Sequence, residues 1–380
     1  MIAPASVSDF RTLAERRLPR VLFDYVDGGA FEEQTLAANI ADLKRIGLKQ
    51  KVLRDVSTID LSTTLFGKKL SLPLVLAPVG FGGMMARRAE VQAARAAEAA
   101  GIAFSLSTVS ICSIEEVRAA TSRPFWFQLY MMKDRGVVKA ILERAQAAGC
   151  TTLLATVDLA ALGTRYRDIR NGMGAQLAGL SALRMAWRFA SRPRWIVDVG
   201  LRGGPLQFGN LTAALKRNSL AAGMAYSGTA FDPSFNFKDL EWIRSNWNGA
   251  IVLKGVLDVD DAREGVANGA DGIVVSNHGG RQLDAACSTI SALPRIADAV
   301  GDKTVILMDG GIRSGQDITR ALALGARACL AGRPWVYAVA ARGQAGVAQM
   351  IETMRNELRT TMALIGKTRI ADIDRSAVTV

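Results

Sequence analysis

Short, continuous apolar runs recur along the chain, and most are separated by segments with a helix-like pattern. The runs lie at 72–80, 102–108, 125–130, 152–158, 250–256, 272–277, 304–310 and 328–333. Uninterrupted apolar residues, rather than an alternation with polar ones, are typical of parallel strands buried on both faces. The segments 87–101 and 134–149 both end at a glycine, where a helix C-cap would lie. Eight such strand–helix units predict an α/β fold, a (β/α)8 TIM barrel, with a doubly wound sheet as the alternative.

One interval between the runs, after the fourth, is much longer than the others. We therefore expect a single domain over 1–380 in which a long insertion or lid, residues 172–235, follows strand four. The other parts of this domain would be an N-terminal helical segment (1–70), the barrel (72–340) and a C-terminal helical segment (341–380).

The insertion mixes large apolar side chains with arginines. Its stretch 180–210 contains Trp187, Phe189, Trp195 and Ile196, interleaved with arginines at 184, 188, 192, 194 and 202. Long loops at the active-site face of a barrel are often lids or docking surfaces. One interpretation is a solvated helix that packs on the barrel. The other is an interfacial segment whose apolar side chains enter lipid while the arginines meet anionic head groups.

Composition and charge narrow the class of protein. Hydrophobic residues make up 49% of the chain and charged ones 22%, as expected for a globular protein with a sizeable core. A net charge of +12 favours binding to nucleic acid, to an anionic membrane surface or to anionic substrates. Because the arginines are scattered and form no basic–aromatic array, we expect no nucleic-acid partner. No apolar run reaches the ~18 residues of a membrane span. The N-terminus lacks a signal-peptide core, which indicates a cytoplasmic protein.

Cysteine and histidine usage disfavours metal and haem sites. Cys112, Cys150, Cys287 and Cys329 form no CxxC pair, so free, buried thiols are expected and no metal. The chain has one histidine, His278, and no CxxCH motif, so it cannot ligate haem through two histidines.

Polar residues or glycines finish every predicted strand. They are Gly80, Ser107, Thr108, Gln128, Tyr130, Thr156, Asp158, Lys254, Ser276, His278, Asp309, Gly310, Gly311, Gly332 and Arg333. Barrels of this kind place their active sites at the C-terminal ends of their strands, so we expect these residues to converge there. The presence of the only histidine favours a functional site over incidental loop composition.

Two glycine–arginine motifs follow the last two strands, DGGIRSG at 309–315 and AGRP at 331–334. Barrels often bind phosphate at these loops, because glycines let backbone N–H groups approach closely. Arg313 and Arg333 could add forked, charge-assisted contacts. Lys254 could hold an anion that forms on a cofactor ring, with a structural ion pair as the alternative.

Several motifs together resemble those of the FMN-dependent 2-hydroxy-acid dehydrogenases and oxidases. The most specific is SNHGGRQLD (276–284), accompanied by FDYVDGGA (23–30), LVLAPVG (74–80), WFQLY (126–130), LLATVD (153–158), VLKGV (252–256) and DGGIRSG. The resemblance covers nearly the whole chain. It implies a TIM barrel that binds FMN and oxidises an (S)-2-hydroxy acid.

The resemblance also implies a role for each matching residue. His278 would be the catalytic base and Asp158 its partner. The substrate would be bound by Tyr25, Tyr130, Arg165 and Arg281. Contacts to FMN would come from Pro78, Val79, Gly80, Ser107, Gln128, Thr156, Lys254, Ser276, Asp309, Gly310, Gly311, Arg313, Gly332 and Arg333.

These residue types suit the implied chemistry. Paired arginines can fix the substrate carboxylate, and an imidazole can take up a proton near neutral pH as two electrons leave for the flavin. Asp158 would stabilise the imidazolium, and Lys254 the negative charge on the reduced flavin. The choice between a hydride and a carbanion route stays open.

Within this family, the sequence looks most like the bacterial L-lactate dehydrogenases. The similarity is carried by 77–97, by STVSICSIEEV and by RPRWIVDVGLRG. It implies oxidation of L-lactate to pyruvate by a peripheral protein on the cytoplasmic side of the inner membrane. Electrons would pass from FMN to a quinone or another acceptor, and a homo-oligomer, a tetramer by analogy, is expected.

Other interpretations remain open. Ala160 and Ala161 stand where family members often carry proline, a departure that the mandelate branch shares. Gly80 and Val109, which the resemblance places beside the flavin, are small and leave room for a larger substrate. An (S)-mandelate-type dehydrogenase and a 2-hydroxy-acid oxidase using oxygen are therefore alternatives. Outside the family, a non-redox barrel lyase or isomerase would use the glycine–arginine motifs to bind a substrate phosphate.

Overall fold

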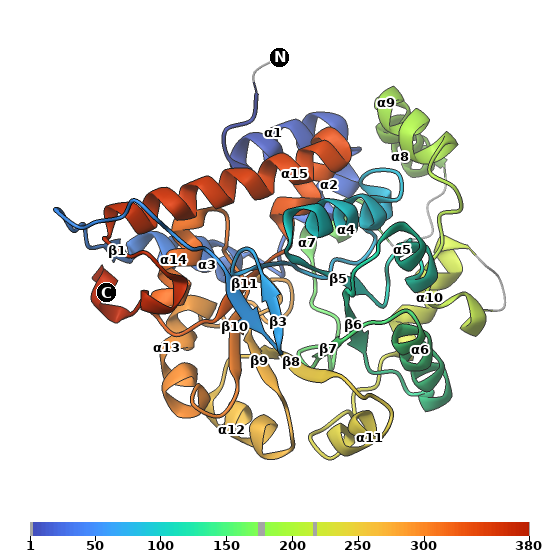
Figure 1. Ribbon diagram of the computed structural model, residues 1–380. Helices are drawn as coiled ribbons and strands as arrows, with labels where there is room; N and C mark the ends of the chain where they lie inside the picture. The colour runs from blue at the N-terminus through green and yellow to red at the C-terminus, as the bar shows by residue number, and fades with distance from the viewer. Residues whose placement is uncertain (1–2, 174–178, 216–218, 380) are drawn as a thin grey trace.

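Eight parallel strands close into a barrel at the centre of the molecule (Figure 1). The computed structural model describes residues 3–173, 179–215 and 219–379. In order around the barrel the strands are β10 (Val305–Met308), β11 (Ala328–Ala331), β4 (Leu74–Leu76), β5 (Ala103–Ser107), β6 (Trp126–Tyr130), β7 (Thr152–Thr156), β8 (Ala250–Val256) and β9 (Gly272–Val275). Each expected apolar run contains one of these strands, so the predicted TIM barrel is confirmed.

Helices that follow the strands cover the outside of the barrel (Figure 1). They are α4 (Ala89–Ala100), α5 (Ile114–Ala120), α6 (Arg135–Ala147), α11 (Asp239–Ser245), α12 (Val259–Ala267), α13 (Thr289–Val300), α14 (Gly315–Ala323) and α15 (Arg333–Leu364). Side chains cap several of them; the Asp134 carboxylate, for example, accepts from two N–H groups in the first turn of α6. The segments expected to be helical, 87–101 and 134–149, contain α4 and α6, and the glycines at their ends, Gly101 and Gly149, both have positive φ, as this end of a helix favours.

The first 70 residues contain strands as well as helices. α1 (Val7–Arg17), α2 (Arg20–Asp27) and α3 (Gln34–Arg45) are followed by β1 (Gly47–Leu48), which pairs with β12 (Val378–Thr379), and by the hairpin of β2 (Thr63–Leu65) and β3 (Lys68–Leu70). Phe66 in the hairpin turn packs against Trp126 at the start of β6, with ring centroids 5.8 Å apart. The hairpin therefore closes the N-terminal end of the barrel, a feature that the sequence pattern did not predict.

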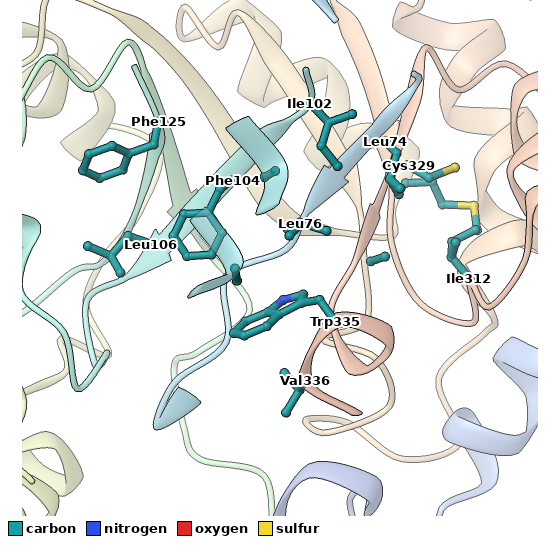
Figure 2. Packing of buried hydrophobic residues seen from close by; sticks show 14 of the residues in the cluster. Leu74, Leu76, Ile102, Phe104, Leu106, Phe125, Ile312, Cys329, Trp335 and Val336 are labelled. Atoms are coloured by element: carbon teal, nitrogen blue, oxygen red, sulfur yellow. The ribbon is translucent and has the colours of Figure 1, made fainter. Parts of the chain in front are cut away.

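The hydrophobic core has two parts, one inside the barrel and one between the barrel and its helices. The interior holds inward-facing strand residues such as Val75, Leu154 and Leu307. In the outer layer, Figure 2 shows Trp335 of α15 beside Leu76 and Phe104. The Trp335 Nε1 donates to the Ala77 carbonyl at 2.9 Å. This contact fixes the start of α15, and with it the loop that carries the AGRP motif.

The insertion forms short helices at one edge of the molecule (Figure 1). After α7 (Tyr166–Arg170) come α8 (Gly179–Ala190), α9 (Pro193–Trp195), the π-helical turn η2 (Ile196–Leu201), the 3-10 turn η3 (Thr212–Ala214) and α10 (Leu220–Ala230). Parts of the expected insertion, 174–178 and 216–218, lie outside the described residues. Trp195 is buried and its Nε1 donates to the Met84 carbonyl at 2.8 Å, while Arg192 donates to the Leu18 carbonyl at 3.0 Å. This side of the insertion is therefore docked on the rest of the molecule.

The same segment also exposes apolar side chains to solvent. Trp187 is 72% exposed, and Leu183, Val197 and Leu201 are exposed as well. These side chains therefore contribute little to the core. Among the helices described, none is both long enough and apolar enough to cross a membrane.

The cysteines differ in burial. Cys112, Cys150 and Cys329 are buried free thiols, as expected, but Cys287 is exposed because it lies in the loop before α13. In the described parts of the chain, no group of three or more metal-binding side chains comes together.

Candidate active site

A cavity of about 950 Å³, including its mouth, opens at the C-terminal ends of the barrel strands. The predicted site residues that line it are Tyr25, Pro78, Val79, Gly80, Gln128, Tyr130, Thr156, Arg165, Lys254, His278, Arg281, Asp309, Gly310, Gly311, Arg313, Gly332 and Arg333. The other three, Ser107, Asp158 and Ser276, are hydrogen-bonded to Gln128, His278 and Lys254 from behind. The fold thus brings all of the predicted site residues to one place.

His278 lines this cavity with its Nδ1 atom held by Asp158. The Nδ1 atom is 3.0 Å from Oδ1 of Asp158. Burial alone would raise the pKa of Asp158, but the charges of His278 and Lys254 and the hydrogen bond outweigh it, so this pKa lies below its usual value. An ionised carboxylate keeps the imidazole proton on Nδ1. The Nε2 atom is then an acceptor, and the Tyr130 hydroxyl is 3.5 Å from it.

The loop that carries His278 has a strained backbone. His278 has a φ of 57°, and Gly279 and Gly280 follow with φ of 66° and 75°. A non-glycine residue in this region persists only where surrounding contacts hold it. One such contact is with α3, since a Cβ on Gly280 would lie 2.5 Å from the Leu36 nitrogen. The N-terminal segment therefore supports the loop directly.

Arg165 and Arg281 line the cavity close to one another. The Arg165 Nη1 atom is 3.8 Å from Asp168, and the Arg281 guanidinium lies 4.8 Å from the centroid of the Tyr25 ring. Burial, and then the charge of Arg281, lower the pKa of Arg165 to about 10. Burial also raises the pKa of Tyr130, so its hydroxyl stays protonated as a donor. Two neighbouring cations and a hydroxyl donor suit a bound carboxylate.

Lys254 is buried at the end of β8 and pairs with Asp309 beyond β10. Its Nζ atom lies 2.9 Å from Oδ2 of Asp309 and donates to the Ser276 hydroxyl at 3.1 Å. Burial opposes the charge on Lys254, but Asp309 and Asp158 outweigh it, so the pKa of Lys254 is raised. The structural ion pair considered above is therefore present. It leaves the second Asp309 oxygen, Oδ1, buried and with no hydrogen-bond partner among the described residues, so this oxygen could accept from a ligand hydroxyl.

Side chains at the ends of β5, β6 and β7 form a chain of hydrogen bonds. The Ser107 hydroxyl donates to Oε1 of Gln128 at 2.9 Å, and Nε2 of Gln128 donates to the Thr156 hydroxyl at 2.9 Å. Both ends of the Gln128 amide are thus fixed where it borders the cavity.

The expected phosphate end is partly occupied by the protein itself. The Arg333 guanidinium donates to the backbone carbonyls of Val26, Gly28 and Gly279. Burial lowers the pKa of Arg333 to about 9, and the nearby charge of Arg313 adds to this effect. A bound anion would relieve this clustering of cations.

A family model described as FMN-dependent dehydrogenase matches residues 14–380. The chain belongs to the FMN-dependent dehydrogenase family. It is 54% identical over 373 residues to the L-lactate dehydrogenase of Caulobacter vibrioides, covering 98% of this chain and 97% of that relative. The crystal structure of the monotopic membrane protein (S)-mandelate dehydrogenase matches with a TM-score of 0.93 at 35% identity, over all of both chains. A mandelate oxidase structure matches with a TM-score of 0.84 at 36% identity, covering 99% of this chain and 98% of that one.

The cavity fits FMN, the cofactor of this family. The unpartnered Asp309 oxygen can accept from a ribityl hydroxyl, and the clustered Arg313 and Arg333 favour the phosphate. Gly310 and Gly311 line the cavity with φ of 85° and 89°, a backbone conformation that glycine favours. Membership of an FMN family leaves no support for the non-redox lyase or isomerase alternative.

Sequence reasoning missed two kinds of residue at this site. The first is its apolar wall, formed by Val26, Ala77, Ile312, Leu330 and Val336. These residues look like ordinary core positions in the sequence. Of the five, only Ala77 and Leu330 lie at the C-terminal end of a strand, whereas Val26 and Val336 belong to α2 and α15. The second is Gln282, which lies within the SNHGGRQLD motif but received no role.

Proposed function

We propose that this enzyme oxidises L-lactate to pyruvate, with FMN as electron acceptor and His278 as the base. The observation that carries the proposal is the His278–Asp158 pair in one cavity with Arg165 and Arg281. A 2-hydroxy acid needs both a base for its proton and cations for its carboxylate. The 54% identity to an L-lactate dehydrogenase, against 35% to a mandelate dehydrogenase, favours L-lactate within this substrate class.

Each side chain has a distinct part in this proposal. Arg165 and Arg281 bind the carboxylate, which fixes C2 and its hydroxyl relative to His278. The Nε2 atom of His278 accepts the substrate proton, and the Asp158 carboxylate at Nδ1 stabilises the imidazolium that results. The Tyr130 hydroxyl, 3.5 Å from Nε2, donates a hydrogen bond to the substrate oxygen. FMN, when bound, accepts the two electrons that the substrate loses.

The remaining polar groups would hold the cofactor. Lys254, Gln128 and Thr156 supply donors for the polar edge of the flavin ring, with Ser107 and Ser276 fixing them from behind. The Asp309 carboxylate would accept a hydrogen bond from a hydroxyl of the ribityl chain. The phosphate is bound by Arg313, Arg333 and the backbone of the two glycine-rich loops.

Anaerobic reduction of the purified flavoprotein tests this proposal. L-lactate should bleach the flavin absorbance rapidly, D-lactate should not, and (S)-mandelate should act much more slowly. His278→Gln should retain the flavin but lose the bleaching, because the chain has no second imidazole. Rapid bleaching by L-lactate in this variant would overturn the role of His278.

A mandelate-type substrate is the second candidate, because the cavity has small residues where a larger group would need room. Gly80 and Val109 both line it. Faster bleaching by (S)-mandelate than by L-lactate would replace L-lactate as the substrate. Rapid reoxidation when oxygen is admitted would identify an oxidase instead of a dehydrogenase.

We further propose that the enzyme is peripheral to the cytoplasmic side of the inner membrane and passes electrons to a quinone. Support comes from the exposed Leu183, Trp187, Val197 and Leu201, and from the match to (S)-mandelate dehydrogenase, which is a monotopic membrane protein. Exposed arginines in the same stretch suit anionic head groups. Lactate-dependent reduction of a short-chain quinone without oxygen tests the acceptor, and the mass of the particle in solution tests the expected tetramer.

A further inference from the structure

Gln282 joins the two loops that carry most of the residues assigned to catalysis and substrate binding. Its Nε2 atom donates to the backbone carbonyls of Asp158 and Ala161 at 2.7 and 2.9 Å, and its Oε1 atom accepts from the Gly163 N–H at 3.1 Å. The amide cannot be reversed, because its oxygen would then face two carbonyl oxygens. Gln282 is only 8% exposed, so water competes little for these bonds.

The loop 158–163 has few other contacts to hold it. Within the described residues, every hydrogen bond from its backbone goes to Gln282. None of its side chains is fully buried, and Ala160, Ala161 and Leu162 are exposed. An open, mostly apolar groove lies along it. The position of this loop therefore depends on the Gln282 amide more than on packing.

A shift of this loop would reach the reacting groups directly. The loop begins at Asp158, which holds Nδ1 of His278, and ends just before Arg165. Gly163 lies so close to the other loop that a Cβ would meet the Arg281 carbonyl oxygen at 2.4 Å. Gln282 itself follows Arg281 in the chain. One amide therefore sets the separation of the two loops at both the base and the carboxylate-binding pair.

We propose that Gln282 is a positioning residue for this reaction. It holds the Asp158 carboxylate on Nδ1 of His278, which fixes the imidazole tautomer, and it keeps Arg165 in register with Arg281. This inference rests on the proposed function for its kinetic consequence, but its effect on the tautomer does not depend on which 2-hydroxy acid is the substrate.

Gln282→Met in the FMN-loaded enzyme tests the proposal, because methionine keeps the length of the side chain and removes all three hydrogen bonds. Misplacing reacting groups by about 1 Å can cost on the order of 100-fold, so we expect kcat/KM for L-lactate to fall by roughly that factor. Because His278 is the only histidine, nitrogen-15 labelling gives one pair of imidazole resonances. The wild type should show the tautomer protonated at Nδ1, and the variant a mixture of tautomers.

Gln146→Met is the matched control. Gln146 bridges backbone in a similar way, donating to the Asn246 carbonyl and accepting from the Asn248 N–H, both at 3.1 Å, but it lies in the last turn of α6, near the opposite end of the barrel. It should lower the melting temperature without moving the imidazole resonances or kcat/KM. If Gln282→Met changes only the melting temperature, as the control does, Gln282 contributes only to the stability of the fold and the proposal is wrong.

A second variant covers the case in which Gln282→Met does not fold. Gln282→Glu keeps an acceptor for Gly163 but sets a carboxylate oxygen against two carbonyls, so it should also disturb the tautomer. An unchanged tautomer there would overturn the proposal. If L-lactate proves not to be the substrate while the tautomer still shifts, the proposed function fails and the positioning role stands.

Discussion

The exposed apolar side chains of the insertion predict how strongly the enzyme binds an anionic membrane. Leu183 is 66% exposed and Leu201 is 75% exposed, so neither contributes much to the fold. Full transfer of a leucine side chain from water is worth roughly 2 kcal/mol, which scales to about 1.5 kcal/mol for each of these exposed fractions. Replacing both with serine should therefore weaken membrane binding by about 3 kcal/mol, or roughly 100-fold.

Co-sedimentation with vesicles of phosphatidylglycerol and phosphatidylcholine measures this effect. Val52→Ser/Leu53→Ser is the matched control, because these side chains are 68% and 98% exposed but follow β1, on the other side of the molecule from α8 and α9 (Figure 1). The control should bind vesicles as the wild type does. Added salt should weaken binding through the arginines of the insertion, since exposed charges are screened.

Two outcomes would refute the reasoning. If the wild type stays in solution with anionic vesicles at low salt, the insertion is not a membrane-binding segment. If the control loses as much affinity as the insertion variant, binding reflects general surface hydrophobicity. Melting temperatures of both variants should match the wild type, because all four residues are exposed.

Three further predictions concern the charges around the site. Asp158→Asn should lower kcat about 100- to 1000-fold with little change in KM. The imidazolium of His278 would lose the carboxylate charge 3.0 Å away, an interaction worth roughly 3–4 kcal/mol. Stopped-flow measurement of flavin reduction checks this. Lys254→Met should destabilise the protein by roughly 3–5 kcal/mol, because it leaves the Asp309 carboxylate buried and unpaired. Adding Asp309→Asn to this variant should restore the free energy of unfolding, measured with urea, but not the activity. Burial would raise the pKa of Asp27, but hydrogen bonds from Arg11 and other donors outweigh it and lower the pKa to about 2 from 3.8. The Asp27 carboxylate should therefore contribute about 2 kcal/mol to the free energy of unfolding above pH 4, and this contribution is lost as the pH falls toward 2. Urea unfolding at pH 5 and pH 2.5 measures the difference, which Arg11→Met should reduce.

The barrel could be predicted from sequence because its strands are buried on both faces and therefore read as unbroken apolar runs. The β2–β3 hairpin could not, because its strands have three residues each and include the exposed Lys68 and Lys69. Such short, partly polar strands carry no periodic signal. The contact of Phe66 with Trp126, which holds the hairpin in place, depends on the closed barrel.

The site residues could be predicted for a similar reason, since parallel strands bring their C-terminal ends together whatever their spacing in the chain. Their hydrogen-bond partners could not. The sequence predicts that Arg333 contacts a phosphate, but it does not predict that Arg333 also donates to three backbone carbonyls. The three contacts of Gln282 are likewise to backbone atoms. Every residue type has a backbone carbonyl, so the identity of the residues does not predict which carbonyls accept these hydrogen bonds.

These backbone contacts explain why the barrel alone does not complete the site. Arg281 and Arg333 are brought together at its open end, and both donate to the Gly28 carbonyl in the N-terminal segment. Arg281 also donates to the Tyr25 carbonyl while its guanidinium stacks on the Tyr25 ring. Carbonyl oxygens partly compensate buried guanidinium groups without neutralising their charge. These hydrogen bonds hold the N-terminal segment against the cavity, where it contributes Tyr25. The positive charge of Arg281 and Arg333 that the carbonyls do not neutralise favours the anionic groups of the cofactor and the substrate.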